Sequence, residues 1–231
     1  MPYLSLTDDA AEVFLGAPGR DLDENNPENR FSLEWLDEMN RVLEEAGDAG
    51  KPVILTATGK FFSNGLDTDY IAANVGDLPA YLDRVHQLYI TVLTLGAPTI
   101  AAINGHAFGA GAMLALCADH RAMRSERGFW SLPEAALNMP FTRGMAALVR
   151  TRTPDATATE AMLTSRRYGG EDAVAAGIVE QAVPGDDLLD AARETARARA
   201  GLVNANQTTI KRGLRLPLLA DLHTPTPPTL L

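Results

Sequence analysis

The stretch "APTIAAINGHAFGAGAMLALCADH" (residues 97–120) decides the fold class, because it joins two kinds of secondary structure through a glycine-rich connection. Its first nine residues are a short apolar run, which is typical of a buried strand. Residues 110–119 are rich in alanine and leucine and predict a helix. A buried strand followed at once by a helix is the building unit of α/β proteins.

The same alternation recurs along the chain. Strands are expected in "YLSL", "AEVFLG", "KPVILTAT", "HRAMRS" and "GIVEQAV". Helical periodicity of apolar residues predicts helices over 33–46, 79–95, 110–119, 142–151, 155–164, 171–176, 185–200 and 204–215. We therefore predict an α/β fold with mainly parallel pairing. The "TPTPPT" segment is expected to be loose, because its prolines fit neither a helix nor a central strand.

Composition and charge limit the classes of partner and the cellular compartment that we expect for this protein. The chain has 231 residues, with 30 acidic and 20 basic side chains, for a formal net charge of −10. Nucleic acids and anionic membranes need clustered Lys and Arg, so neither is expected as a partner. The single cysteine, Cys117, excludes an internal disulfide and suits a reducing compartment. No signal peptide, membrane-length apolar run or peroxisomal tripeptide is recognisable, so we expect a soluble, cytoplasmic protein.

Two loops that follow buried strands could supply backbone N–H groups to a ligand. In "FFSNGLD" (residues 61–67), Gly65 permits a backbone conformation that turns the N–H of Leu66 outward. In the second loop, Gly109 and Gly111 flank Ala110, whose N–H lies unpaired at the positive end of a helix dipole. Brought together, the two N–H groups would stabilise a developing oxyanion. The alternative is that these glycines only allow close packing of strand and helix.

One acidic residue lies in apolar surroundings. Glu134 occurs in "WSLPEAALNMP" (residues 130–140). A carboxyl group among apolar side chains has a raised pKa and can act as a base near neutral pH. The alternative is that Glu134 caps a helix or pairs with Arg143.

Other motifs are weak or absent. A dinucleotide fingerprint would need a glycine where Leu114 stands, and no phosphate-binding loop is present. Ser63 is not in a nucleophile elbow. The four histidines show no metal-ligand spacing, and only His106 lies in a suggestive loop. Cys117 is expected in the core.

The chain resembles the crotonase superfamily of acyl-CoA enzymes, over about residues 5 to 215. The resemblance rests on "FFSNGLD", "IAAINGHAFGAGAMLALCADHRAM" and "WSLPEAALNMPFTRGMAAL", in this order and spacing. It implies a crotonase-like ββα spiral core over 1–184 and a C-terminal helical trimerisation region over 185–231. It also implies a homotrimer or a dimer of trimers, a small-molecule acyl-CoA substrate, and no metal or cofactor beyond the CoA of the substrate.

The resemblance assigns roles to individual residues. The oxyanion N–H groups map onto Leu66 and Ala110. Hydratases of the family carry two glutamates, of which the second maps onto Glu134 and the first onto Met113. A thioether cannot move a proton, so the chain resembles single-glutamate Δ3,Δ2-enoyl-CoA isomerases, in particular their plant branch. The alternatives are a weak hydratase, another acyl-CoA reaction such as decarboxylation, or a non-catalytic acyl-CoA-binding trimer.

Further ligand contacts are expected around the two loops and from a basic patch. Those of the loops are Ser63, Gly65, Asp67 and Gly109. The CoA phosphates need a local positive charge, for which Lys211 and Arg212 in "IKRGLR" are the first candidates and Lys60 is another. Four aromatic residues are candidates either for the acyl tunnel or for the core: Tyr70, Tyr81, Phe108 and Phe141.

Overall fold

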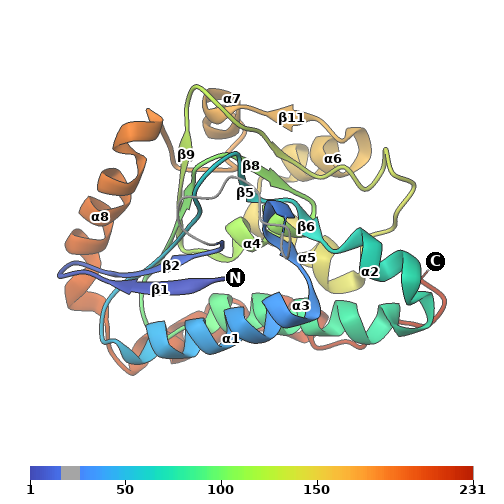
Figure 1. Ribbon diagram of the computed structural model, residues 1–231, viewed down its shortest axis with the longest axis horizontal. Helices are drawn as coiled ribbons and strands as arrows, with labels where there is room; N and C mark the ends of the chain where they lie inside the picture. The colour runs from blue at the N-terminus through green and yellow to red at the C-terminus, as the bar shows by residue number, and fades with distance from the viewer. Residues whose placement is uncertain (17–26, 231) are drawn as a thin grey trace.

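The computed structural model describes residues 1–16 and 27–230, and its strands form two main sheets (Figure 1). The larger sheet has six strands in the order β1-β2-β4-β7-β9-β12, and only the β1–β2 pair is antiparallel. Its strands are β1 (Tyr3–Leu6), β2 (Ala11–Phe14), β4 (Val53–Thr56), β7 (Thr99–Ile103), β9 (His120–Arg124) and β12 (Gln181–Val183).

A smaller sheet and a two-stranded ribbon carry the loops singled out in the sequence. The four-stranded sheet has the order β11-β10-β8-β5, and the ribbon pairs β3 with β6 in parallel. Their strands are β3 (Arg30–Phe31), β5 (Phe61–Ser63), β6 (Gly65–Leu66), β8 (His106–Phe108), β10 (Trp130–Ser131) and β11 (Arg167–Tyr168).

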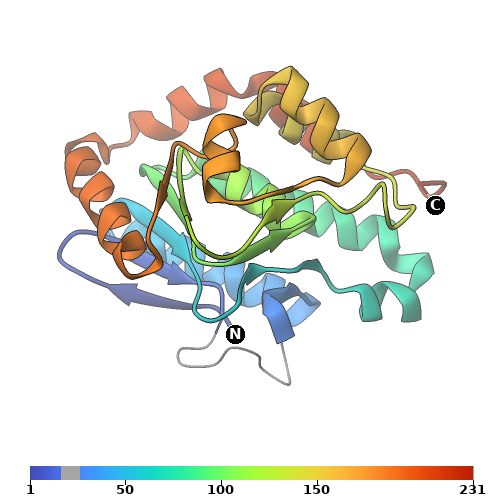
Figure 2. The same cartoon turned by 90° about the horizontal axis from the view of Figure 1, so that it is seen from above.

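Helices enclose the two sheets, which confirms the predicted α/β class. In Figure 1, α1 and α3 run side by side along the lower edge, and Figure 2 shows the strands between α8 at one end and α2 at the other. The helices are α1 (Leu33–Asp48), α2 (Thr68–Ala73), α3 (Leu78–Thr94), α4 (Ala110–Cys117), α5 (Arg143–Arg152), α6 (Asp155–Thr164), α7 (Gly170–Ala175), α8 (Leu188–Arg199), α9 (Asn206–Leu214) and α10 (Leu216–Leu222).

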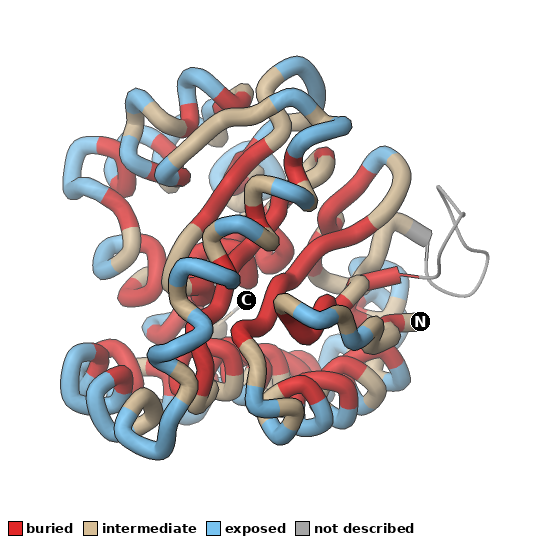
Figure 3. The backbone as a smooth tube through the Cα atoms, turned by 90° about the vertical axis from the view of Figure 1, so that its left-hand side faces the viewer, coloured by how far each residue is buried: buried red, intermediate tan, exposed pale blue. Residues whose placement is uncertain are grey.

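Helix α4 lies at the centre of the core. All eight of its residues are buried, which explains its uniform alanine and leucine content. Two buried side chains hold its carbonyls: Tyr89 Oη donates to Ala110 O at 2.9 Å and Trp130 Nε1 donates to Ala112 O at 3.0 Å. The beginning of α4 is therefore fixed from two sides. Figure 3 shows the same pattern for the whole molecule, with buried strands inside and exposed turns on the outer helices.

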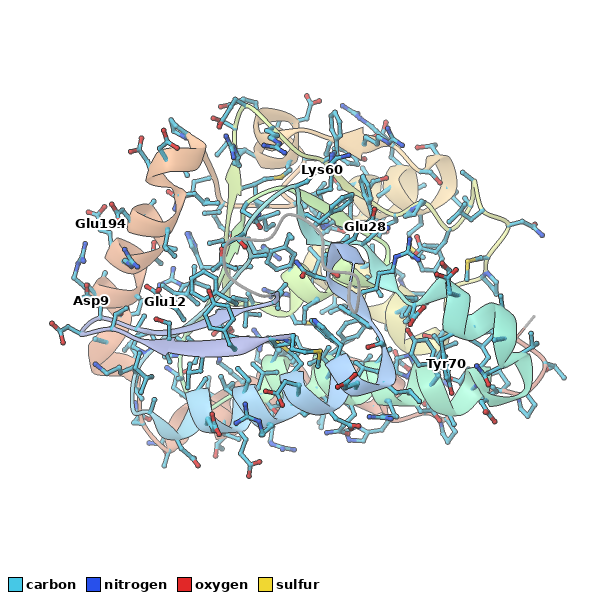
Figure 4. The ribbon with its side chains drawn as sticks, in the orientation of Figure 1. Asp9, Glu12, Glu28, Lys60, Tyr70 and Glu194 are labelled. Atoms are coloured by element: carbon cyan, nitrogen blue, oxygen red, sulfur yellow. The ribbon has the colours of Figure 1, made fainter. Side chains whose placement is uncertain are left out.

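Helix α8 packs on the larger sheet and is tied to the β1–β2 hairpin. Its buried residues Leu188, Ala192 and Ala196 join an apolar cluster with residues of the strands. Arg193 Nε donates to Glu12 at 2.6 Å, and Arg197 pairs with Asp9 at 2.7 Å. Figure 4 shows the two acidic side chains on the hairpin facing this helix. The division of the chain at residue 184 stays a prediction.

Two local expectations were wrong. The predicted strand 177–183 is shorter, because Gly177 (φ +69°) ends the preceding helix and Ile178 N donates to Ala173 O at 2.8 Å. The "TPTPPT" segment is anchored, since Thr226 is 6% exposed and its N–H donates to Asp83 at 2.9 Å. Proline excludes regular structure but also stiffens an extended chain, so one hydrogen bond can hold it. Among the described residues, no helix combines the length and apolarity needed to cross a membrane.

Candidate active site

The two glycine-containing loops meet through their backbones. Gly65 has a φ of +82°, which a residue with a side chain rarely adopts. A Cβ atom on Gly65 would lie 2.7 Å from Phe108 O and 2.9 Å from Ala110 N. Strand β6 therefore crosses the beginning of α4 at backbone contact, so Leu66 and Ala110 lie on either side of this contact.

Side chains of the first loop fix its conformation. Ser63 Oγ donates to Asn29 O at 2.8 Å and accepts a hydrogen bond from Gly65 N at 3.0 Å. The Asp67 carboxylate caps α2 by accepting a hydrogen bond from Tyr70 N at 3.1 Å. The backbone N–H of Asp67 donates to Tyr81 Oη at 2.9 Å. Ser63 and Asp67, which were expected to contact substrate, are thus engaged in shaping the loop.

The two glycines of the second loop, Gly109 and Gly111, are required for different structural reasons. Gly109 adopts a φ of +50° just before α4 begins. A Cβ atom on Gly111 would lie 2.7 Å from the Ser63 Cβ, so this glycine is needed for close packing. Ala110 is the first residue of α4, and a helix gives its first N–H groups no internal acceptor. Both readings of the Gly-Ala-Gly sequence, close packing and an outward N–H at the helix start, fit this geometry.

Glu134 lies directly beside this second loop. A Cβ atom on Gly109 would be 3.1 Å from Glu134 Oε1. Oε2 is buried and has no hydrogen-bond partner among the described residues. Burial raises the pKa of Glu134 to about 7. The alternative ion pair with Arg143 is wrong, because the Arg143 guanidinium pairs with Asp221 at 2.6 Å.

A small, partly enclosed cavity with a free volume of about 30 Å³ brings the loops and the carboxyl group together. Among its described lining residues, Glu134 is the one ionisable side chain, and most of the others are apolar. Met113, at the position where hydratases are expected to carry a glutamate, is fully buried and lines the same cavity. The lining residues are Leu66, Leu78, Leu82, Ala110, Met113, Glu134, Met139, Pro140, Thr142, Met145 and Leu230.

The sequence did not identify the apolar wall of this cavity. The four aromatic candidates, Tyr70, Tyr81, Phe108 and Phe141, are not among its lining residues. Tyr81 is buried, and its ring contacts Tyr70 with centroids 5.3 Å apart. The wall comes instead from leucines and methionines at the beginnings of α3 and α5 and from Leu230. Such residues carry no signal in the sequence that separates them from ordinary core residues.

Aromatic side chains of strands β5 and β8 lie close to two cations, Lys60 just before β5 and Arg167 of β11. The His106 ring contacts Phe108, with centroids 5.0 Å apart. Lys60 Nζ lies 5.3 Å from the centre of the Phe61 ring, and the Arg167 guanidinium lies 5.8 Å from that of Phe108. Partial burial, and then the charges of Lys60 and Arg167, lower the pKa of His106. Figure 4 shows Lys60 on this side of the molecule. Positive charge therefore lies on the β5–β8 side of the site.

Lys211 cannot serve as the predicted phosphate ligand in this arrangement. It is 4% exposed, and its Nζ contacts Asp119 at 2.6 Å and Ala97 O at 2.7 Å. Asp119 also pairs with the buried Arg215 at 2.6 Å. The basic run on α9 thus places one cation in an internal ion-pair cluster, while its neighbour Arg212 is exposed.

Replacing Lys211 with methionine tests this correction. We expect the free energy of unfolding to fall by about 1–3 kcal/mol, because Ala97 O loses its donor and Asp119 loses one of two cations. Affinity for a CoA ester should stay unchanged. Urea unfolding and calorimetric titration measure the two quantities, with Arg150→Met, at an exposed position of α5, as the control. Unchanged stability with weakened CoA-ester binding would restore the predicted phosphate contact.

Comparison with known sequences identifies the family to which the chain is similar. A family model described as enoyl-CoA hydratase/isomerase matches residues 21–219. The chain is 36% identical over 166 residues to peroxisomal enoyl-CoA delta isomerase 2 of Arabidopsis thaliana, covering 67% of this chain and 69% of that protein. It is 40% identical over 148 residues to carnitinyl-CoA dehydratase of Escherichia coli strain K12, covering 62% of this chain and 55% of that protein.

Solved structures of similar fold cover nearly the whole chain. A probable enoyl-CoA hydratase, EchA3, from Mycobacterium tuberculosis has a TM-score of 0.86 at 22% identity, covering 97% of this chain and 92% of that one. An enoyl-CoA hydratase from Bacillus anthracis has a TM-score of 0.80 at 28% identity, covering 96% and 85%.

Proposed function

Since the chain belongs to the enoyl-CoA hydratase/isomerase family, we propose that it is a Δ3,Δ2-enoyl-CoA isomerase whose single acid/base is Glu134. Family membership and structural likeness also confirm the predicted crotonase-like α/β fold. One observation carries the mechanistic proposal. An unpaired carboxyl group and the backbone of two converging loops share one apolar cavity, and a methionine occupies the position of a second acid.

The proposed reaction needs one base and one oxyanion site. The N–H groups of Leu66 and Ala110 hold the thioester oxygen of a 3-enoyl-CoA. The Glu134 carboxylate takes a proton from C2, and the electron pair of that C–H bond delocalises into a dienolate. Negative charge collects on the thioester oxygen, where the N–H groups stabilise it. Glu134 then returns the proton to C4, which leaves a C2=C3 double bond and regenerates the carboxylate.

Hydration is the less suitable reaction for this cavity. Adding water to a double bond needs a water molecule held and activated between two acidic groups. Met113 offers a thioether in place of one of them, and no other described residue lining the cavity is ionisable. Isomerisation avoids this requirement, because the same carboxyl group serves both proton transfers.

The substrate's two ends fit different sides of the site. Lys60 and Arg167, near β5 and β8, suit the CoA phosphates, whereas the apolar cavity suits the acyl group. The proposed chemistry needs no cofactor besides the CoA of the substrate. We further propose a homotrimer or dimer of trimers in the cytoplasm, although two of the Arabidopsis relatives are named peroxisomal.

An absorbance assay tests the proposed function. The product carries its double bond in conjugation with the thioester and gains an ultraviolet absorption band that the unconjugated 3-enoyl substrate lacks. We expect absorbance to rise with 3-hexenoyl-CoA, and hydration of 2-hexenoyl-CoA to be slower by orders of magnitude. Faster hydration than isomerisation would reject the proposal in favour of a hydratase. Absence of turnover, with acyl-CoA binding retained, would favour a binding protein.

The raised pKa of Glu134 predicts the pH dependence. A base must be ionised to accept the C2 proton, so kcat/KM should be small well below pH 7, rise through about pH 7, and level off above it. Below its pKa the reaction should lose about tenfold in rate per pH unit. Steady-state rates at subsaturating 3-enoyl-CoA across pH measure this. An inflection near pH 4.5, the ordinary value for glutamate, would contradict the assignment.

A further inference from the structure

The catalytic cavity shares part of its lining with a second hollow. The outer hollow is an open groove of about 570 Å³, formed by Ala135, Asn138, Met139, Pro140 and Leu230. Three of these residues, Met139, Pro140 and Leu230, also line the cavity at Glu134. The two hollows are therefore adjacent, and these three residues form the wall that both share.

Leu230 lies in a part of this wall that no helix or strand holds. The leucines and methionines of α3, α4 and α5 are held in helices. Leu230 lies in the segment after α10, where Thr226 N donates to Asp83 of α3 at 2.9 Å and Leu230 N donates to Pro227 O at 3.2 Å. Figures 1 and 2 show this segment at the end of the molecule that carries α2.

The inner cavity is narrow in this structure, with a free volume of about 30 Å³. A long acyl chain can enter only if part of the lining moves. Lys60 and Arg167 lie outside this cavity, near β5 and β8, so a CoA ester whose phosphates bind there would extend its acyl end into the apolar cavity that Leu230 lines.

We propose that Leu230 is a specificity-determining residue that limits the length of the acyl chain. With Leu230 in place, the inner cavity ends at its side chain, and short acyl groups fill the site. When Leu230 moves aside, the cavity opens into the outer groove, which then receives the distal carbons of a longer chain. The inference rests on the proposed function only for the identity of the ligand as an acyl-CoA.

Binding of saturated acyl-CoA esters tests this directly. Each buried methylene group tightens binding by about fourfold, so affinity should rise with chain length from butanoyl- to decanoyl-CoA until the cavity is full. Leu230→Ala removes three carbon atoms from the wall, and affinity should go on rising for about three carbons longer. Leu230→Trp should stop the rise at a shorter chain. Leu163→Ala, an exposed leucine of α6, is the matched control and should behave like the unmodified chain.

Isothermal titration calorimetry supplies the four affinity profiles. Identical length dependence in the Ala, Trp and unmodified proteins would overturn the proposed role of Leu230. Because saturated esters cannot react, the result does not depend on catalysis. A Leu230-dependent profile in a protein that fails to convert 3-enoyl-CoA supports the role of Leu230 while rejecting the isomerase. Full isomerase activity together with identical profiles supports the isomerase and rejects the role of Leu230.

Discussion

Glu134→Gln lowers kcat/KM for a 3-enoyl-CoA by about 10²–10⁴-fold, the range that a positioned general base contributes. Glutamine has nearly the same shape as glutamate, but its amide cannot accept the C2 proton. Oε2 of Glu134 has no hydrogen-bond partner among the described residues, so the substitution breaks no contact there. It also removes a carboxyl group whose burial is unfavourable to its charged form. Stability should therefore be unchanged or slightly higher.

Three measurements distinguish loss of a base from loss of structure. The conjugated-enoyl absorbance gives the rate, thermal unfolding gives the stability, and titration with a saturated ester gives the affinity of the site. We expect only the rate to fall. Glu194→Gln is the matched control, because Glu194 is an exposed residue of α8 on the far side of the molecule from α2 (Figure 4). A Glu134→Gln protein with at least a tenth of the original rate would reject Glu134 as the base.

Local sequence signals predicted much of the fold and the centre of the site. A serine directly before apolar residues at helical spacing is typical of a helix start, and Ser32 Oγ caps α1 by accepting from Trp35 N at 3.1 Å. The glycines of both loops were recognised because Gly65 and Gly109 need a backbone conformation that other residues rarely adopt. Glu134 was recognisable because an acid in an apolar segment is unusual. In each case the constraint acts within a few residues along the chain.

What the sequence did not reveal depends on contacts between distant residues. The basic run on α9 gave no sign that Lys211 would be buried, since its partner Asp119 is 92 positions away along the chain. A proline-rich segment gave no sign that Thr226 would bond to Asp83 and that Leu230 would reach the catalytic cavity. Charge and polarity of a segment set its average environment, whereas the partner that buries it is decided by the tertiary fold.

Gly65→Ala should cost about 10²–10³-fold in kcat, the usual effect of losing one oxyanion donor. The new Cβ would lie 2.7 Å from Phe108 O and 2.9 Å from Ala110 N. Both are backbone atoms, which no change of side-chain rotamer can move away. The two loops must therefore separate by several tenths of an ångström or more, and the N–H groups of Leu66 and Ala110 no longer converge on one oxygen. Turnover of 3-hexenoyl-CoA at saturating concentration measures the loss.

Alanine at a positive φ also strains the backbone, so the effect of strain must be separated from that of the loop contact. Gly50→Ala provides this control: Gly50 follows α1 with a φ of +66°, and a Cβ atom there would meet nothing within 4 Å. Both variants should lose comparable stability from strain, about 1–2 kcal/mol. Only Gly65→Ala should lose turnover beyond what its unfolded fraction explains. If Gly65→Ala unfolds no more readily than Gly50→Ala and still keeps its full kcat, the oxyanion site does not lie where β6 crosses the beginning of α4, and the proposed reaction loses its electrostatic basis.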